Sequence, residues 1–296
     1  MKISVVVLTY NRKALLLRCL ASILEDRVRM PDEIVIVNAG QESVEDVISK
    51  FIKNGCPIKV IKAPNISLAD NRNKGVMASS CELVAFTDDD CEVCPGWVDA
   101  FVRVFDNRED IGSVGGLTID ITTQKFAHNL ESISLLIEDY YNRRYSPRCY
   151  YFSTRNVCYL KKIVVDVGYF DSTYRKSFED VLMGIKIFEA GHKNIYCPEI
   201  FVRHYGRDGA LQVMRRQFQY GRDMFLITRC NVKAADGYIF KARRSIPYII
   251  LSTFAGPVRD AFRFKSARNP LAVVFFSFVL KLMVNSGILF ERFRKR

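Results

Sequence analysis

The chain has 296 residues, of which 49% are hydrophobic and 26% are charged, a globular composition that excludes a disordered polypeptide. Its net charge of +12 is concentrated at the C-terminal end: residues 203–296 hold 19 Lys/Arg and 5 Asp/Glu, whereas the preceding part holds 25 and 27. The basic end therefore predicts a polyanionic partner, either phospholipid or nucleic acid. Nine scattered cysteines, most of them in apolar stretches, fit reduced packed thiols better than a disulfide framework.

Strands and helices alternate through residues 1–118, the pattern of a parallel sheet with crossover helices. The predicted strands are Ile3–Thr9, Glu33–Asn38, Lys59–Lys62, Leu83–Thr87 and Ile111–Thr118. The predicted helices run through Leu15–Ile23, Val44–Phe51, Ala69–Ala78 and Trp97–Phe105. We therefore expect an α/β fold with a Rossmann-like, mostly parallel sheet flanked by helices. No signal peptide precedes the first strand, so we expect the protein to start in the cytosol.

Three consecutive aspartates, Asp88, Asp89 and Asp90, follow the fourth predicted strand. Clustered carboxylates repel one another unless a cation or strong hydrogen-bond donors neutralise them. Side chains alternate along an extended segment, so Asp88 and Asp90 should face the same way. Mg²⁺ and Mn²⁺ bind one or two protein carboxylates and leave the other positions to water and phosphate oxygens. The triplet predicts a metal-bridged diphosphate, with a solvated acidic turn as the alternative.

Two further polar clusters end strands of the same predicted sheet. Residues 9–12 (TYNR) follow the first strand, and Asn38 ends the second. Ligands of open parallel sheets bind beyond the carboxyl ends of the strands. The three clusters should therefore converge on one rim.

Cys91 and Cys94 form a Cys-x-x-Cys pair near this rim, but two further ligands at zinc-site spacing are missing, so we do not expect zinc.

The second part of the predicted domain contains another acidic pair. A less regular stretch follows the sheet half, with a possible helix over Leu130–Tyr141. Glu179 and Asp180 then lie in the first turn of a helix that ends at Gly191. Acidic residues are favourable in a first helical turn because they interact with the helix dipole, and this alone can account for the pair. A catalytic role needs support from the rest of the chain.

The C-terminal end holds two apolar stretches between basic segments. Ile246–Pro257 is too short to cross a bilayer, and Leu271–Phe290 is about twenty residues long but contains Lys281 and Asn285. Basic flanks on both sides fit a segment that lies in the membrane interface at least as well as one that crosses it. We expect a membrane-associated helical extension, with a buried helical hairpin as the alternative.

Together these elements resemble the GT-A glycosyltransferases of family 2, which transfer sugars from nucleotide sugars with inversion at the anomeric carbon. The resemblance runs from Ile3 to about Arg229 and rests on the order and spacing of short elements. They are VVVLTYNR (5–12), ADNRNKG (69–75), VAFTDDD (84–90) with Pro95 and Trp97, VGYFD (167–171), FED (178–180), Gly191, Pro198 and His204.

The resemblance implies a donor pocket at the predicted rim. Its nucleotide-binding and donor-binding residues would be Thr9, Tyr10, Asn11, Arg12, Asn38, Arg72, Asp88 and Asp89. Tyr10 offers a stacking face to the base, and Arg72 would approach the diphosphate or base. The family usually carries acidic residues just after the second strand, where this chain has Asn38 and Ala39. The usual uracil contact, and hence the donor nucleotide, stays open.

The resemblance also implies the reacting groups. Mg²⁺ or Mn²⁺ would be held by Asp88 and Asp90, with His204 as a further ligand to the metal or diphosphate. Asp180 matches the catalytic base that takes the proton of the acceptor hydroxyl, and Glu179 its supporting neighbour. The arginines of residues 215–222 could meet phosphates or be simple solvated charge.

We therefore expect an inverting, metal-dependent glycosyltransferase on the cytoplasmic face of a membrane, peripheral or anchored by its C-terminal segment. Its partners would be a nucleoside-diphosphate sugar, a glycan or polyprenyl- or dolichyl-linked acceptor and an anionic membrane surface, without nucleic acid. Residues 1–118 would bind the nucleotide sugar, 119–230 would bind the acceptor and supply the base, and 231–296 would form the basic apolar tail. The alternatives are a sugar-phosphate nucleotidyltransferase, which should have a Gly-rich phosphate loop, and a non-catalytic membrane- or nucleic-acid-binding protein.

Overall fold

The computed structural model describes residues 1–65, 67–106, 108–122, 125–147, 152–173, 177–206, 209–227, 246–264 and 270–294. The chain folds into two compact units. The sheet unit comprises residues 1–119 and 139–205, and the helical unit comprises 120–138 and 206–296. The predicted division of function at residues 118 and 230 stays a prediction. Its second boundary lies outside the described residues.

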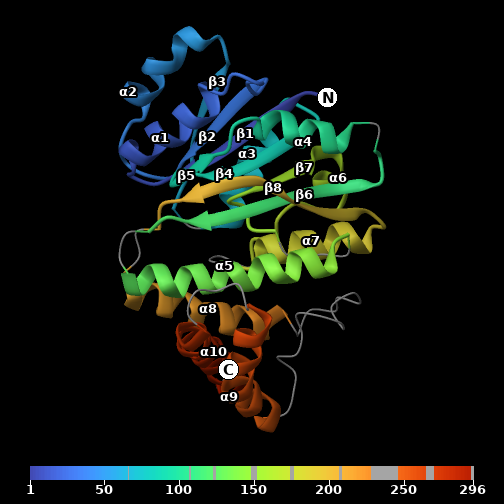
Figure 1. Ribbon diagram of the computed structural model, residues 1–296. Coiled ribbons are helices and arrows are strands. Elements are labelled where there is room, and N and C mark those ends of the chain that lie inside the picture. The colour runs from blue at the N-terminus through green and yellow to red at the C-terminus, as the bar shows by residue number, and fades with distance from the viewer. Residues whose placement is uncertain are drawn as a thin grey trace. The chain divides into compact units, whose positions relative to one another are not determined.

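The sheet unit is built on eight strands in the order β3-β2-β1-β4-β7-β6-β8-β5 (Figure 1). Their bounds are β1 Ile3–Thr9, β2 Glu33–Asn38, β3 Ile58–Lys62, β4 Leu83–Asp88, β5 Cys91–Val93, β6 Ile111–Asp120, β7 Val157–Leu160 and β8 Lys193–His204. The first four pair in parallel, as predicted, and the predicted strand positions are confirmed there. The pairs β4/β7, β6/β7 and β5/β8 are antiparallel, so the sheet is mixed rather than mostly parallel.

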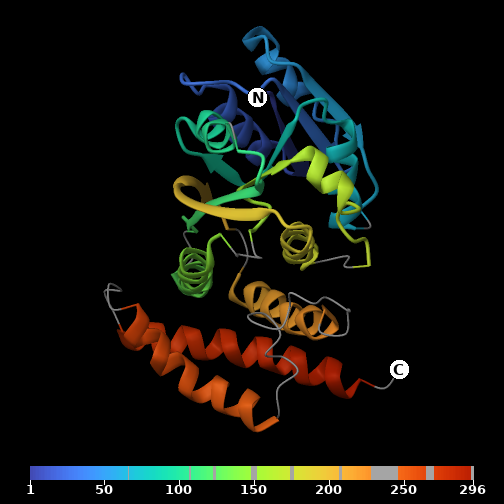
Figure 2. The same cartoon turned by 90° about the vertical axis from the view of Figure 1, so that its right-hand side faces the viewer.

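Helices cover both faces of this sheet (Figures 1 and 2). Their bounds are α1 Lys13–Leu24, α2 Glu45–Ile48, α3 Leu68–Ala78, α4 Trp97–Phe105, α6 Lys161–Asp166 and α7 Glu179–Glu189, with a 3-10 helix over Ser49–Asn54. Alternate residues of β1 enter two different cores. Val5 packs with α1, α2 and α4, whereas Val6 packs with α3, α6 and α7. A strand buried on both faces has to be apolar throughout, which explains the continuous apolar run of β1.

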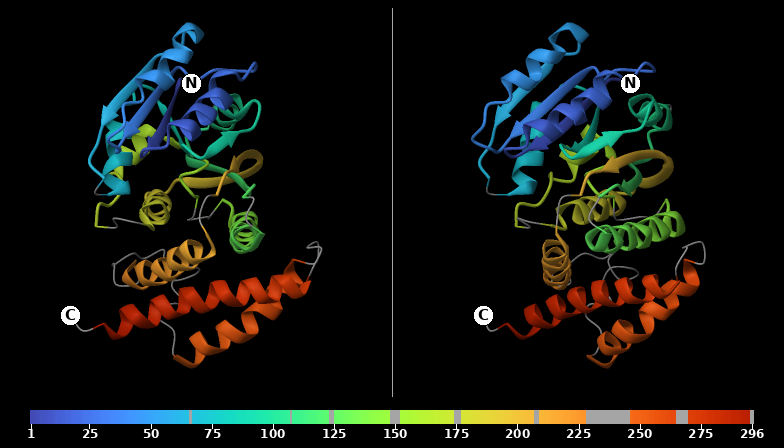
Figure 3. Two further views of the ribbon diagram at one scale, coloured as in Figure 1. Left: turned by 90° about the vertical axis from the view of Figure 1, so that its left-hand side faces the viewer. Right: turned by 60° about the vertical axis from the view of Figure 1, so that its left-hand side comes forward.

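The helical unit consists of the first part of α5 (Lys125–Tyr145) together with α8 (Ala210–Ile227), α9 (Ile246–Arg263) and α10 (Pro270–Phe293). In Figure 3, α9 and α10 lie side by side and α10 also runs beside α8. Two glycines allow α8 and α10 to touch at backbone level. A Cβ at Gly221 would lie 1.9 Å from the Val284 carbonyl oxygen, and one at Gly287 would lie 2.0 Å from that of Phe218. Small residues at such crossings are common in membrane helices.

Candidate active site

The acidic triplet covers the end of β4 and the turn that leads to β5. β4 ends at Asp88 and β5 begins at Cys91, so Asp89 and Asp90 occupy the turn itself. The alternation of side chains along a strand therefore ends at Asp88. The prediction that Asp88 and Asp90 share one strand face does not hold, because Asp90 lies in the turn. Asp89 is buried, and the Thr9 hydroxyl donates to its Oδ2 at 2.7 Å. Burial raises the pKa of Asp89 to about 7, against the opposing effects of Arg12 and Thr9.

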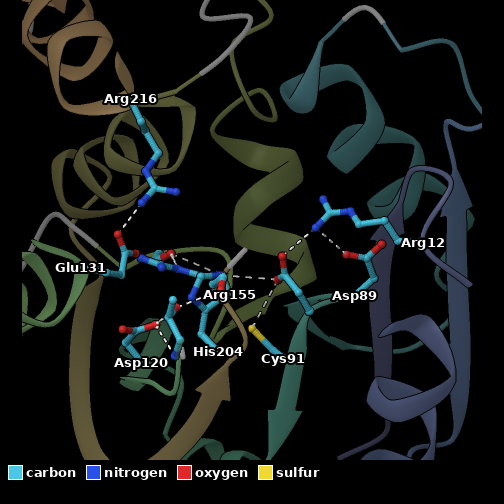
Figure 4. Close-up of polar contacts among 12 residues, drawn as sticks. Arg12, Asp89, Cys91, Asp120, Glu131, Arg155, His204 and Arg216 are labelled. Carbon is cyan, nitrogen blue, oxygen red and sulfur yellow. Dashed lines mark hydrogen bonds and ion pairs between the residues drawn. The ribbon is translucent and has the colours of Figure 1, made fainter. Parts of the chain in front are cut away.

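Arg12 is the cation that the carboxylates face in the structure. Its Nη1 lies 2.6 Å from Asp90 Oδ2 and 3.3 Å from Asp89 Oδ1 (Figure 4). One guanidinium does not balance three carboxyl groups when all are ionised. The turn therefore retains the negative potential that attracts a further cation.

Among the described residues, Asp90 and His204 bring a carboxylate and an imidazole close enough that they could hold a divalent ion. His204 ends β8 and pairs in register with Cys91, which brings His204 Nε2 to 3.6 Å from Asp90 Oδ1. Both atoms can reach one ion at about 2.1 Å. In the described ranges, no three His, Cys, Asp or Glu side chains form a metal-binding cluster, so Asp88 does not join Asp90 and His204 in one set. Two protein donors are enough for Mg²⁺ or Mn²⁺, which keep positions for water and phosphate.

The other rim residues shape the loops at the ends of β1 and β2. Tyr10 is 45% exposed, which leaves its ring available for stacking. Asn11 has a φ of 50°, and its Oδ1 accepts hydrogen bonds from the backbone N–H groups of Gln41 and Glu42 at 2.8 and 3.2 Å. Asn38 is buried; its amide accepts from Gly40 N–H and donates to the Glu42 carbonyl. These contacts use one N–H and the oxygen of the Asn38 amide to shape the loop after β2, and the role of Asn38 in nucleotide binding stays a prediction.

Arg72 and Glu179 form a buried ion pair between α3 and the start of α7. They are 5% and 2% exposed. Among the described residues, no hydrogen-bond partner reaches Arg72 Nε or Glu179 Oε2. Arg72 was predicted to approach the donor directly, whereas the structure places its guanidinium on the neighbour of Asp180.

Asp180 is half-buried in the second position of α7, and its Oδ1 accepts from the backbone N–H of Val181 at 2.8 Å. The surrounding protein raises the pKa of Asp180, while Arg72, Arg155 and backbone hydrogen bonds from Val181 and Thr154 oppose that shift. A raised pKa makes a carboxylate a stronger base at neutral pH. Phe178, just before this pair, has a φ of 70°. Non-glycine residues in this left-handed region carry strain of about 1–3 kcal/mol and cluster at functional sites.

Removing one partner of the Arg72–Glu179 pair should be strongly destabilising. We expect Arg72→Ala to lower the free energy of unfolding by about 3–5 kcal/mol, because it leaves a buried carboxylate alone. The double variant Arg72→Met/Glu179→Met should recover most of that loss, since it buries no unpaired charge. Urea denaturation measures both. Arg103→Ala, which breaks a surface pair with Asp99, is the control and should cost about 0–1 kcal/mol. Equal losses in the single and double Arg72 variants would contradict the assignment.

No sequence motif points to Arg155 as a functional residue. Its positive charge opposes the rise in the pKa of Asp180 and of Cys91, so it acts near the Glu179–Asp180 pair and on the residue after the acidic turn. It precedes a four-residue strand, β7, and belongs to no readable motif.

In the helical unit, Arg216 pairs with Glu131 (Figure 4), and Arg222 pairs with Glu291 at 2.9 Å. Two of the three arginines of residues 215–222 are therefore held by carboxylates.

The family profile described as Glycosyl transferase family 2 matches residues 4–182. The chain belongs to this family. It is a glycosyltransferase. Membership in this family favours that prediction over the nucleotidyltransferase and the non-catalytic alternatives. The profile covers β1, the acidic turn and the Glu179–Asp180 pair.

Three curated relatives show how far the similarity extends. A glucosyl-dolichyl phosphate glucuronosyltransferase of Haloferax volcanii is 25% identical over 218 residues, covering 69% of each chain. An uncharacterized glycosyltransferase of Bacillus subtilis, YwdF, is 36% identical over 38% of this chain and 41% of its own. The hyaluronan synthase of Pasteurella multocida is 24% identical over 64% of this chain and 23% of its own. The chain thus spans less than half the length of the latter two.

Solved structures show the GT-A fold. The mannosyltransferase PcManGT from Pyrobaculum calidifontis, in complex with GDP-Man and Mn²⁺, matches with a TM-score of 0.68 and 13% identity, over 100% of this chain and 88% of that one. GalNAc-T7 with UDP, GalNAc and Mn²⁺ matches with a TM-score of 0.58 and 16% identity, over 83% and 52%. At these identities the likeness concerns the fold alone.

Proposed function

We propose that this family 2 enzyme transfers a sugar, with inversion, from a nucleoside-diphosphate sugar to a hydroxyl group of a glycan or lipid-linked acceptor. The observation that carries the proposal is the presence, in one compact unit, of two acidic sites with different surroundings. The turn at Asp88–Asp90 faces Arg12 and His204, whereas Asp180 is shielded beside the Arg72–Glu179 pair. Carboxyl groups whose environments differ in this way can take different roles in one reaction.

In the proposed mechanism, Asp90 and His204 would hold Mg²⁺ or Mn²⁺. When bound, the ion would supply Lewis-acid stabilisation of the charge that develops on the leaving diphosphate. Arg12 adds a fixed positive charge beside the same turn, and Tyr10 offers a stacking surface to the base. The Asp180 carboxylate accepts the proton of the acceptor hydroxyl as that oxygen attacks the anomeric carbon. Arg72 holds Glu179, which keeps the start of α7 in place.

The membrane part of the proposal rests on the C-terminal segment and on one relative. α10 is a helix of 24 residues that is long and apolar enough to cross a membrane by length and composition. The Haloferax relative is named for a dolichyl phosphate substrate. We propose that the acceptor of this enzyme is lipid-linked and is met at the cytoplasmic face of a membrane.

A thermal-shift panel of UDP-, GDP- and dTDP-sugars, with and without Mn²⁺, tests the donor. We expect one nucleotide class to raise the melting temperature, and Mn²⁺ to enlarge the effect. A ligand at a hundred times its dissociation constant stabilises by about 2.7 kcal/mol, which is enough to identify the donor. The nucleoside monophosphates are the controls, because they lack the diphosphate. If no nucleotide sugar stabilises the protein, or if pyrophosphate is released from a nucleoside triphosphate and a sugar phosphate, the proposal is wrong.

A further inference from the structure

The hairpin formed by α9 and α10 has its polar side chains on the inside. Ser277, Lys281 and Asn285 recur every four residues along α10 and so share one face. Ser277 Oγ donates to Asp260 Oδ2 at 2.6 Å, and the Lys281 ammonium pairs with the same carboxylate. Asn285 Nδ2 donates to Thr253 Oγ1 at 2.7 Å. The polar residues that interrupt the apolar run of α10 are therefore satisfied by α9.

The exposed surface of the same hairpin is apolar. Large apolar side chains of α9 follow one another every four residues and remain 40–68% exposed: Ile246, Ile250, Phe254, Val258 and Phe262. On α10 the corresponding residues, 51–80% exposed, are Leu271, Phe275, Phe290 and Phe293. A water-soluble hairpin shows the opposite arrangement, with its apolar stripe inward. A surface that is apolar outside and hydrogen-bonded inside suits a hydrocarbon environment.

The charge of this part of the chain selects lipid over a second copy of the protein. Residues 203–296 carry 19 Lys/Arg and 5 Asp/Glu. Arg259 and Arg263 lie on α9 itself, and Arg292 and Arg294 lie at the end of α10. Basic residues near an anionic bilayer surface are attracted to its lipid headgroups. Two copies that met through this face would bring two strongly positive segments together, which is unfavourable.

The contacts of α10 favour an orientation in the plane of the membrane over one across it. One side of α10 is occupied by α8, through the Gly221 and Gly287 contacts and the Arg222–Glu291 ion pair. A crossing α10 would carry Lys281, with its partner Asp260, into the centre of the hydrocarbon, where charged groups are costly. An in-plane hairpin keeps these charges near the headgroups.

We propose that α9 and α10 form a monotopic hairpin that inserts into one leaflet of an anionic membrane. Phe254, Phe262, Leu271 and Phe275 enter the upper acyl region, and the flanking arginines contact lipid phosphates. This inference deepens the membrane attachment proposed above, and its tests do not use sugar transfer as a readout.

Vesicle flotation of the full chain tests whether the hairpin binds an anionic membrane. We expect binding to phosphatidylcholine vesicles that contain one third phosphatidylglycerol, and at least about tenfold weaker binding to phosphatidylcholine alone. The double variant Phe254→Ser/Phe262→Ser should lose at least about tenfold in binding, because two aromatic side chains no longer enter the membrane. Met77→Ser, at an equally exposed apolar position on α3 (60%), is the matched control and should bind like the parent. Equal binding by the parent and the double variant, or a lipid-free dimer that the double variant abolishes, overturns the proposal.

Single tryptophan reporters test the in-plane orientation. The chain has one tryptophan, Trp97, which is fully buried and provides a constant background. Tryptophan at Leu271, Leu282 or Phe290 should be quenched by brominated lipids at one shared shallow depth. A graded depth with Leu282 deepest indicates a crossing helix and overturns the orientation. The donor thermal shift of the same proteins without vesicles separates the two proposals: lipid binding without any nucleotide-sugar stabilisation contradicts the proposed function and leaves the hairpin standing.

Discussion

Asp180→Asn is expected to lower kcat by about 10²–10⁴-fold and to leave the affinity for the nucleotide sugar unchanged. The amide has nearly the shape of the carboxylate, and its oxygen can keep the hydrogen bond from Val181 N–H. It cannot take up the proton of the acceptor hydroxyl, so the chemical step is lost and donor binding is kept. Initial rates with saturating acceptor, together with the thermal shift by the donor, measure the two effects separately.

The pH dependence of kcat/KM gives an independent measurement of the same group. Asp180 acts as a base in its deprotonated form, and burial raises its pKa. Activity should therefore be full above that pKa and fall as the pH drops through it, at a higher pH than an exposed aspartate would give. Asp166→Asn, a change at an exposed carboxylate that pairs with Lys162, is the control and should leave both rate and pH profile unchanged. Full transfer activity in Asp180→Asn would remove Asp180 from the mechanism.

The parallel half of the sheet could be predicted because its signal is local. β1, β2 and β4 are apolar runs buried on both faces, and each ends at a polar cluster. The antiparallel half depends on pairing between distant segments. β5 has three residues and pairs with the end of β8, more than a hundred residues later. A strand of three residues is too short to show an alternating hydrophobic pattern. Its partner β8 contains Pro198, a residue that is unusual within a strand.

The site shows the same difference between local and distant information. The acidic turn and the start of α7 stand out as motifs, so Asp90 and Asp180 could be selected from the sequence. The partner of Glu179 could not, because Arg72 is 107 residues away. The same holds for the C-terminal hairpin. In the sequence, Lys281 and Asn285 only interrupt an apolar stretch. In the structure, Lys281 pairs with Asp260 and Asn285 donates to Thr253.

Asp90→Ala is expected to abolish the Mn²⁺-dependent part of nucleoside-diphosphate binding. A divalent ion contributes several kcal/mol of interaction with phosphate oxygens, so the affinity for the diphosphate should fall at least about tenfold. The variant keeps Asp89, which Thr9 and Arg12 hold in the turn. We therefore expect the protein to fold and to retain weak, metal-independent binding. Thermal stability with nucleoside diphosphate, measured with and without Mn²⁺, follows this change without any need for an active enzyme.

Two further variants separate loss of the ion from loss of charge at the turn. His204→Ala removes the second proposed ligand, 3.6 Å from Asp90, and should also weaken the Mn²⁺ effect although it leaves the carboxylates unchanged. Asp110→Ala removes an exposed carboxylate that pairs with Lys193 and should keep the full Mn²⁺ effect. If only the total negative charge mattered, Asp90→Ala would lose binding and His204→Ala would not. Metal-dependent binding of parental strength in both Asp90→Ala and His204→Ala would require the ion to be held elsewhere, with Asp88 and Asp89 as the other carboxyl groups of the triplet.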